Sequence, residues 1–210
     1  MIKGNIKLIH ADCMDIMAQY EDNYFDLAIV DPPYGININH SIGRRKGDKP
    51  SSHKKVKWDS ETPNKKYFNE LFRVSKDQII WGANYFMSKI AKDSSCWIMW
   101  DKRFSENVSF SQFEMAFTSF SGTSKKFDKC PSQKFKIHPT QKPTALYDWQ
   151  YKNYAEQGQK ILDTHLGSGS NAISAYYFGV GEFVGIELDK EYFDAACKRV
   201  DEQTNQLKMF

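Results

Sequence analysis

The chain has 210 residues, of which 40% are hydrophobic and 26% charged, and its formal net charge is +3. This length suits one globular domain, or two small ones at most. The longest apolar run, Cys96 to Trp100, is far shorter than the ~20 residues that cross a membrane, so no membrane partner is expected. Residues 1–7 lack the apolar core of a secretory signal, which predicts a cytoplasmic location. Four scattered cysteines without metal-ligand spacing predict free thiols and no metal site.

Short β-branched and aromatic runs that end in polar or glycine-containing turns predict seven strands. These strands are expected at residues 6–10, 25–30, 78–81, 96–100, 113–118, 160–163 and 183–187. Helix-like stretches lie between most of them, and Thr62-Pro63 is a typical helix start. Apolar runs without alternation, such as Leu27 to Val30, are typical of strands covered by helices on both faces. A mostly parallel α/β sheet is therefore expected.

Positive charge is concentrated in two short segments. Residues 41–57 carry seven lysines and arginines against one aspartate, a net charge of +6, and residues 121–137 carry five lysines against one aspartate, or +4. The rest of the chain is therefore at −7. Both segments lack the periodicity of a helix or strand, which predicts loops that contact a polyanion. Ordinary solvated lysines are an equally good explanation of the charge alone.

The sequence Asp31-Pro32-Pro33-Tyr34-Gly35 directly follows the strand expected at residues 25–30. In parallel α/β sheets, ligands bind beyond the carboxyl ends of the strands. Two successive prolines remove two backbone donors and leave rigid carbonyl acceptors. A carboxylate, a fixed carbonyl and an aromatic ring together suit a planar ligand with an exocyclic amine. An ordinary turn after a strand is the alternative.

Two further strand ends indicate a cofactor site. Gly167 and Gly169 lie in a strand-to-helix turn, where the backbone can approach a ligand closely at the positive end of a helix. Glu187 ends the next strand about 20 residues later, where an acidic side chain can accept hydrogen bonds from ribose hydroxyls. The three-glycine dinucleotide signature and a phosphate-binding lysine motif are missing. A cofactor with a ribose but without phosphates fits better.

Together with the segment His138-Pro139-Thr140-Gln141-Lys142-Pro143, these motifs resemble the β-class of S-adenosylmethionine-dependent DNA amino-methyltransferases. The catalytic motif precedes the cofactor loop, which is the circularly permuted order of that class, and the resemblance runs from about Ile6 to Val200. It implies a single methyltransferase domain over residues 1–210 with a Rossmann-like fold, in which helices flank a mostly parallel seven-stranded sheet. The Asp-Pro-Pro-Tyr form is typical of adenine-N6 enzymes. The implied function is site-specific methyl transfer from S-adenosyl-L-methionine to N6 of a flipped adenine in DNA.

The resemblance also implies roles for individual residues. Asp31 and the Pro32 carbonyl would hold the target amine and Tyr34 would stack on the flipped base, so the predicted catalytic residues are Asp31, Pro32, Pro33 and Tyr34. The predicted cofactor-binding residues are Asp12, Thr140, Lys142, Asp163, His165, Gly167, Ser168, Gly169 and Glu187. Among them, Asp12 would lie near the cofactor adenine, Glu187 at the ribose, and Thr140 and Lys142 near the methionine end. DNA contacts are expected from basic loops at residues 37–58 and 121–137, through Arg44, Arg45, Lys46, Lys54, Lys55, Lys57, Lys125 and Lys126.

The chain departs from the family pattern at His165, where a phenylalanine is usual. We expect this histidine to pack as an aromatic ring, although it could instead hydrogen-bond or titrate near neutral pH. A proline-rich turn that caps the next helix is the alternative for residues 138–143.

Several alternatives remain for the function. A cytosine-N4 methyltransferase would use the same geometry, RNA or a protein amide could be the substrate, and a methyltransferase-fold DNA-binding module could lack activity. Little of the chain is left to read a DNA sequence, which predicts modest specificity or an unseen partner. A homodimer and a cognate restriction enzyme are the candidate partners besides DNA.

Overall fold

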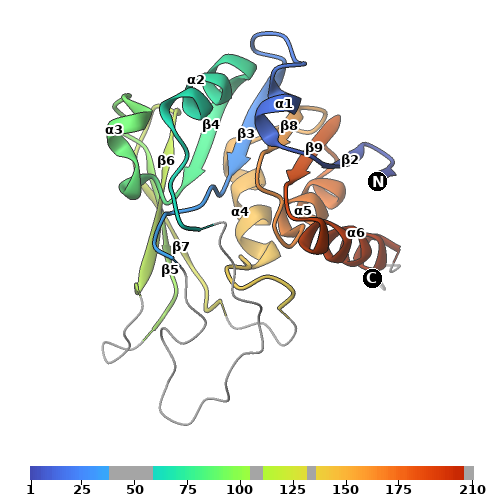
Figure 1. The fold of residues 1–210 in the computed structure, drawn as a ribbon. Coiled ribbons are helices and arrows are strands. Elements are labelled where there is room, and N and C mark those ends of the chain that lie inside the picture. Colours follow the sequence, from blue (N-terminus) through green and yellow to red (C-terminus); the bar gives the residue numbers. More distant parts are fainter. Residues whose placement is uncertain (38–58, 105–110, 132–135, 206–210) are drawn as a thin grey trace.

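The computed structural model describes residues 1–37, 59–104, 111–131 and 136–205. Its strands are β1 (Ile2–Lys3), β2 (Ile6–His10), β3 (Phe25–Val30), β4 (Ser75–Trp81), β5 (Trp97–Asp101), β6 (Phe113–Thr118), β7 (Lys125–Asp128), β8 (Lys160–Asp163) and β9 (Glu182–Glu187). Its helices are α1 (Cys13–Met17), α2 (Lys65–Val74), α3 (Met87–Ile90), α4 (Thr144–Tyr154), α5 (Ser170–Phe178) and α6 (Lys190–Asn205), with a 3-10 turn η1 (Ala83–Tyr85). All nine strands join one sheet in the order β1-β2-β9-β8-β3-β4-β6-β5-β7 (Figure 1).

The predicted α/β class is confirmed, and each of the seven expected strands is present within a few residues. The described part of the chain adds β1 and β7, so the sheet has nine strands and not seven. The pairing is parallel from β2 through β9, β8 and β3 to β4, while β6 runs antiparallel to both β4 and β5. The sheet is therefore mostly parallel, as expected, and β6 is antiparallel to both of its neighbours near the β7 edge.

Strand β7 contradicts the prediction that residues 121–137 form a loop. Lys125 to Asp128 pair in parallel with β5, with Ile98 opposite Lys125. Charged side chains are tolerated there because β7 is the last strand of the sheet, and lysines are common on edge strands. A four-residue strand with one apolar residue has no alternation to detect, so its partner strand decides its conformation.

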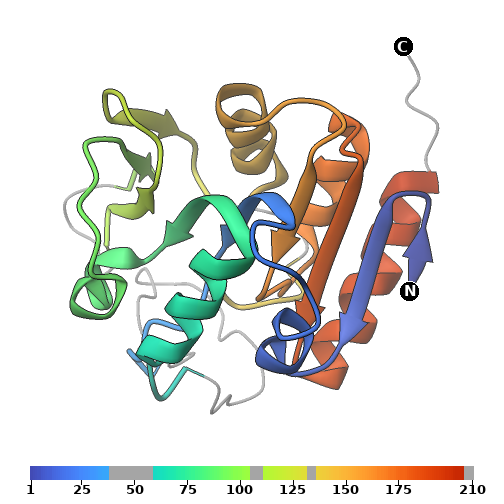
Figure 2. The same ribbon diagram turned by 90° about the horizontal axis from the view of Figure 1, so that it is seen from above.

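Two layers of helices cover the sheet (Figure 2). On one face, α4, α5 and α6 enclose an apolar cluster that includes Leu146, Ile173 and Val200. On the other face, α1, α2 and α3 enclose a second cluster that includes Phe68 and Phe86. Strands buried from both sides leave their carboxyl ends as the accessible polar edge of the sheet.

Helix α2 begins later than the sequence indicates. Its N-cap is Asn64, whose side chain accepts a hydrogen bond from the Tyr67 N–H at 3.1 Å. The predicted cap, Thr62, is used otherwise, because its hydroxyl and the Pro63 carbonyl (2.9 Å) both accept from Lys89 Nζ. Within the described ranges, no helix has the length and apolar character needed to cross a bilayer.

Candidate active site

A cavity of about 540 Å³ opens at the carboxyl ends of β2, β3, β8 and β9. This volume is within the range of small-molecule sites, roughly 300–1,000 Å³. Parallel pairing brings these strand ends together, with His10 opposite Glu187 and Asp163 opposite Gly185. The predicted site residues that line the cavity are Asp12, Asp31, Pro33, Thr140, Lys142, His165, Gly167, Ser168 and Glu187.

Four predicted site residues do not line the cavity: Pro32, Tyr34, Asp163 and Gly169. Asp163 is buried below the glycine loop and accepts hydrogen bonds from the His165 N–H and from Asn171 Nδ2, both at 3.0 Å. Burial raises the pKa of Asp163 to about 7. Gly169 has φ +73°, and a Cβ there would lie 2.8 Å from the side chain of Val200 on α6. Asp163 and Gly169 therefore support the conformation of the glycine loop without lining the cavity.

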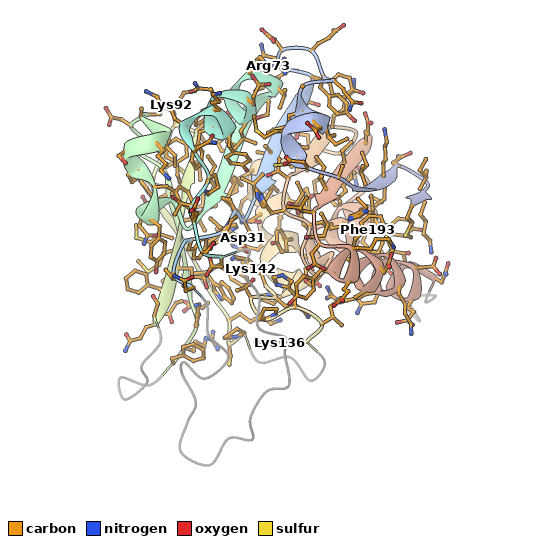
Figure 3. The ribbon with its side chains drawn as sticks, viewed as in Figure 1. Asp31, Arg73, Lys92, Lys136, Lys142 and Phe193 are labelled. Atoms are coloured by element: carbon orange, nitrogen blue, oxygen red, sulfur yellow. The ribbon has the colours of Figure 1, made fainter. Side chains whose placement is uncertain are left out.

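Asp31 emerges from the end of β3 with both carboxylate oxygens engaged. Oδ1 accepts a hydrogen bond from the Tyr34 hydroxyl at 2.7 Å, and Oδ2 accepts from Lys142 Nζ at 2.6 Å. Figure 3 shows Asp31 and Lys142 side by side at the centre of the molecule. Burial raises the pKa of Asp31, while the Lys142 ammonium opposes that rise. Each carboxylate oxygen has a second acceptor position, so Asp31 retains acceptor capacity toward the cavity.

Lys142 connects Asp31 to a second carboxylate that sequence analysis did not identify. Glu114 Oε2, on β6, lies 3.0 Å from Lys142 Nζ, and Glu114 Oε1 lies 2.6 Å from Lys102 Nζ. The side chain of Lys142 is only 3% exposed. Burial disfavours the ionised form of Glu114, yet the two lysines hold its pKa at about 2. A charged residue in an otherwise apolar strand was the only local signal of its role.

The ring of Tyr34 lies directly against the backbone of Gly82, which follows β4. Gly82 has φ +68°, and a Cβ there would come within 2.0 Å of Tyr34 Cε1. Tyr34 also stacks on the exposed Tyr85, with ring centroids 5.1 Å apart and planes at 15°. The Gly82 contact requires a residue without a side chain, and it helps to aim the Tyr34 hydroxyl at Asp31.

At the side of the cavity away from Asp31, Glu187 is hydrogen-bonded to the backbone of the glycine loop. Its Oε2 accepts from the Gly167 N–H and its Oε1 from the Asp189 N–H, both at 2.9 Å. Burial raises the pKa of Glu187. Asp12 lies on the neighbouring strand end, where its side chain caps α1 through the Met14 N–H at 2.8 Å. Two carboxylates thus line the cavity on the same side of the glycine loop, because the strands that precede them lie in the order β2-β9-β8.

His165 packs as expected and also hydrogen-bonds. Its ring meets that of Tyr67 edge-on, with centroids 5.4 Å apart, and its Nδ1 lies 2.9 Å from Thr164 Oγ1. Burial lowers the pKa of His165 to about 4, so the ring is neutral at neutral pH.

The segment at residues 138–143 forms part of the cavity wall. His138 Nδ1 lies 3.0 Å from Thr140 Oγ1, and the Lys142 carbonyl accepts from Ser170 Oγ at 2.8 Å. The segment also leads directly into α4, with Pro143 at its N-cap. It is therefore both the helix-preceding turn and a wall of the cavity.

Of the predicted DNA-contacting residues, the structure describes Lys125 and Lys126, and neither lines the cavity. Arg44, Arg45, Lys46, Lys54, Lys55 and Lys57 lie outside the described residues. On β7, Lys125 Nζ donates to Asn153 Oδ1 at 3.0 Å, and Lys126 pairs with Asp128 at 3.1 Å.

The fold is that of solved DNA methyltransferases. It is similar to M1.HpyAVI in complex with SAM (TM-score 0.64, 21% identity, 96% of this chain and 100% of that chain). It is also similar to the PvuII DNA methyltransferase, which is cytosine-N4-specific (TM-score 0.62, 9% identity, 96% of this chain and 92% of that chain).

The sequence model of the DNA methylases, N6_N4_Mtase, matches residues 80–198, more than half of the chain, and the chain belongs to this family. The type II methyltransferase M.HpaI of Haemophilus parainfluenzae is 25% identical over 246 residues, which cover 95% of this chain and 75% of that protein.

Proposed function

We propose that this DNA methyltransferase transfers a methyl group from S-adenosyl-L-methionine to N6 of an adenine flipped out of DNA. One observation carries the proposal: Asp31, at the start of the Asp-Pro-Pro-Tyr motif, faces the same cavity as Gly167 and Glu187. An amine acceptor and a nucleoside-binding loop therefore share one cavity.

The residues of the cavity fit the cofactor. Glu187 uses one acceptor position of each oxygen for backbone N–H groups, which leaves others for ribose hydroxyls. The positive φ of Gly167 (52°) keeps the loop backbone open to the cavity. When bound, S-adenosyl-L-methionine supplies an activated methyl group on a sulfonium.

The chain's own task is to hold the target amine in line with that methyl group. Asp31 and the Pro32 carbonyl each accept one N–H of the amine, which directs the nitrogen lone pair toward the methyl carbon. As the nitrogen gains positive charge, the Asp31 carboxylate stabilises it and takes the released proton. Stacking of the base on Tyr34, as predicted from the sequence, would offset part of the cost of flipping and would take place beside the ring of Tyr85, on which Tyr34 stacks.

The remaining parts of the proposal concern partners. Contacts of the two basic segments with DNA phosphates, a homodimer, a cognate restriction enzyme and a cytoplasmic location stay predictions from the sequence.

Product analysis tests the proposal. The protein is incubated with unmethylated DNA and S-adenosyl-L-methionine carrying a labelled methyl group, and the nucleosides are separated by chromatography. We expect label in N6-methyladenine. Label in N4-methylcytosine would refute the choice of base, and label in neither would refute methyl transfer to DNA.

Asp31→Asn should abolish transfer while cofactor binding, measured by calorimetry, stays nearly intact. Asp26→Asn is the matched control, because Asp26 lies on β3, the strand that Asp31 directly follows, and pairs with the exposed Lys76 at 2.7 Å. Full transfer by the Asp31 variant would contradict its assignment as the amine acceptor.

A further inference from the structure

A row of four alternating charges begins at Asp31, and only this first member belongs to the catalytic motif. The row is Asp31, Lys142, Glu114 and Lys102, with successive N···O distances of 2.6, 3.0 and 2.6 Å. None of the four side chains is more than 20% exposed. Little solvent screens these charges from one another.

All three N–H groups of the Lys142 ammonium have an oxygen acceptor. Its ammonium contacts Asp31 Oδ2, Glu114 Oε2 and the Tyr34 hydroxyl (3.2 Å), and an ammonium has three N–H groups. Lys142 therefore divides its charge between two carboxylates. Glu114 in turn is divided between Lys142 and Lys102.

We propose that Glu114 is a positioning residue for methyl transfer, which acts by sharing Lys142 and so keeps Asp31 a strong acceptor for the target amine. The inference rests on the proposed function, because it assigns Asp31 the amine. Without Glu114, the whole ammonium charge would oppose the positive charge that develops on the amine nitrogen. With Glu114 ionised, the four charges of the row sum to zero and Asp31 keeps its negative field.

The ionisable groups around Asp31 determine the direction in which its pKa shifts when Glu114 or Lys102 is replaced. Burial raises the pKa of Asp31, Lys142 lowers it and Glu114 raises it. The other ionisable groups around it are Tyr34, Tyr147 on α4, Asp163 on β8 and Tyr67 on α2. Burial holds the pKa of each of these three tyrosines well above its usual value, so they stay neutral. Loss of the Glu114 charge must therefore lower the pKa of Asp31, and loss of Lys102, which draws Glu114 away from Lys142, must raise it.

Two isosteric or near-isosteric variants test the inference with opposite expected signs. In Glu114→Gln, we expect kcat to fall by about tenfold or more, the effect of one uncompensated charge near a reaction centre. The KM values for DNA and cofactor should change little, and the acidic limb of the kcat–pH profile should move to lower pH. In Lys102→Met, that limb should move to higher pH.

A titration of the Asp31 carboxyl carbon by NMR gives a second readout that needs no activity. We expect its pKa to fall in Glu114→Gln and to rise in Lys102→Met. Glu70→Gln is the control, because Glu70 pairs with Arg73 at 2.8 Å on α2, and Figure 3 shows Arg73 far from Asp31. This control should change neither kcat nor the titration.

The outcomes separate the two proposals. If the unmodified protein transfers no methyl group, the proposed function fails, and the Asp31 titration alone decides whether Glu114 acts on Asp31. If the unmodified protein is active but the two variants shift neither the limb nor the titration, or shift them in the same direction, the role of Glu114 is refuted. If Glu114→Gln does not fold, Lys102→Met carries the test.

Discussion

Replacement of Lys142 by methionine should destabilise the fold strongly, because it leaves two buried carboxylates without their shared cation. Asp31 lies 2.6 Å and Glu114 3.0 Å from the Lys142 ammonium, whose side chain is 3% exposed. Removal of one partner from a buried ion pair costs about 3–5 kcal/mol. For a chain of this size, each kcal/mol lowers Tm by roughly 2–4 °C. We therefore expect Tm to fall by roughly 6–20 °C at neutral pH.

The pH dependence of this loss follows from Asp31. In Lys142→Met the hydrogen bond from Tyr34 still opposes the burial that raises the pKa of Asp31, but the Lys142 ammonium no longer does, so the folded-state pKa exceeds the unfolded value of about 3.9 by more than before. A carboxyl with a higher pKa in the folded state destabilises the fold as pH rises. The deficit should be full at pH 8 and should shrink as pH falls, by at most about 1.4 kcal/mol per pH unit for one proton.

Urea unfolding at pH 8 and pH 5, followed by circular dichroism, measures this deficit as a difference in free energy of unfolding. Lys76→Met is the control, since Lys76 forms an exposed pair with Asp26 and its loss should cost about 1 kcal/mol or less. A Lys142 variant as stable as the unmodified protein, or a deficit equal at both pH values, would refute the reasoning.

Two further substitutions test the walls of the cavity. Gly82→Ala should lower the free energy of unfolding by about 1–2 kcal/mol, because alanine is strained at the left-handed φ of this position. The added methyl group should also displace Tyr34, so methyl transfer should fall more than cofactor binding. A transfer assay and calorimetry measure the two effects, and unchanged transfer would count against the close contact. His165→Phe should bind cofactor with the same pH dependence between pH 5 and 8 as the unmodified protein, since burial holds the pKa of His165 at about 4. A difference that follows titration in that range would show that the histidine carries charge there.

The sheet and its polar edge could be predicted because their signals are local. Runs such as Phe25 to Val30 specify a doubly covered strand through their own apolar side chains. The motif that follows such a run must then lie at the carboxyl edge, where Asp31, Gly167 and Glu187 all face one cavity. Sequence alone thus determined the fold class, the strand ends and the motifs that bear on the chemistry.

Tertiary structure decided what depends on partners distant in the chain. Strand β7 exists because β5 offers it backbone hydrogen bonds, and Thr62 yields the helix cap to Asn64 because Lys89 occupies its hydroxyl. Lys142 meets Asp31 across 111 residues of sequence, and a contact of that separation leaves no periodicity to read. Electrostatic pairing in a buried site depends on distance and exposure in space. For that reason the charge row behind Asp31 became visible only in the folded chain.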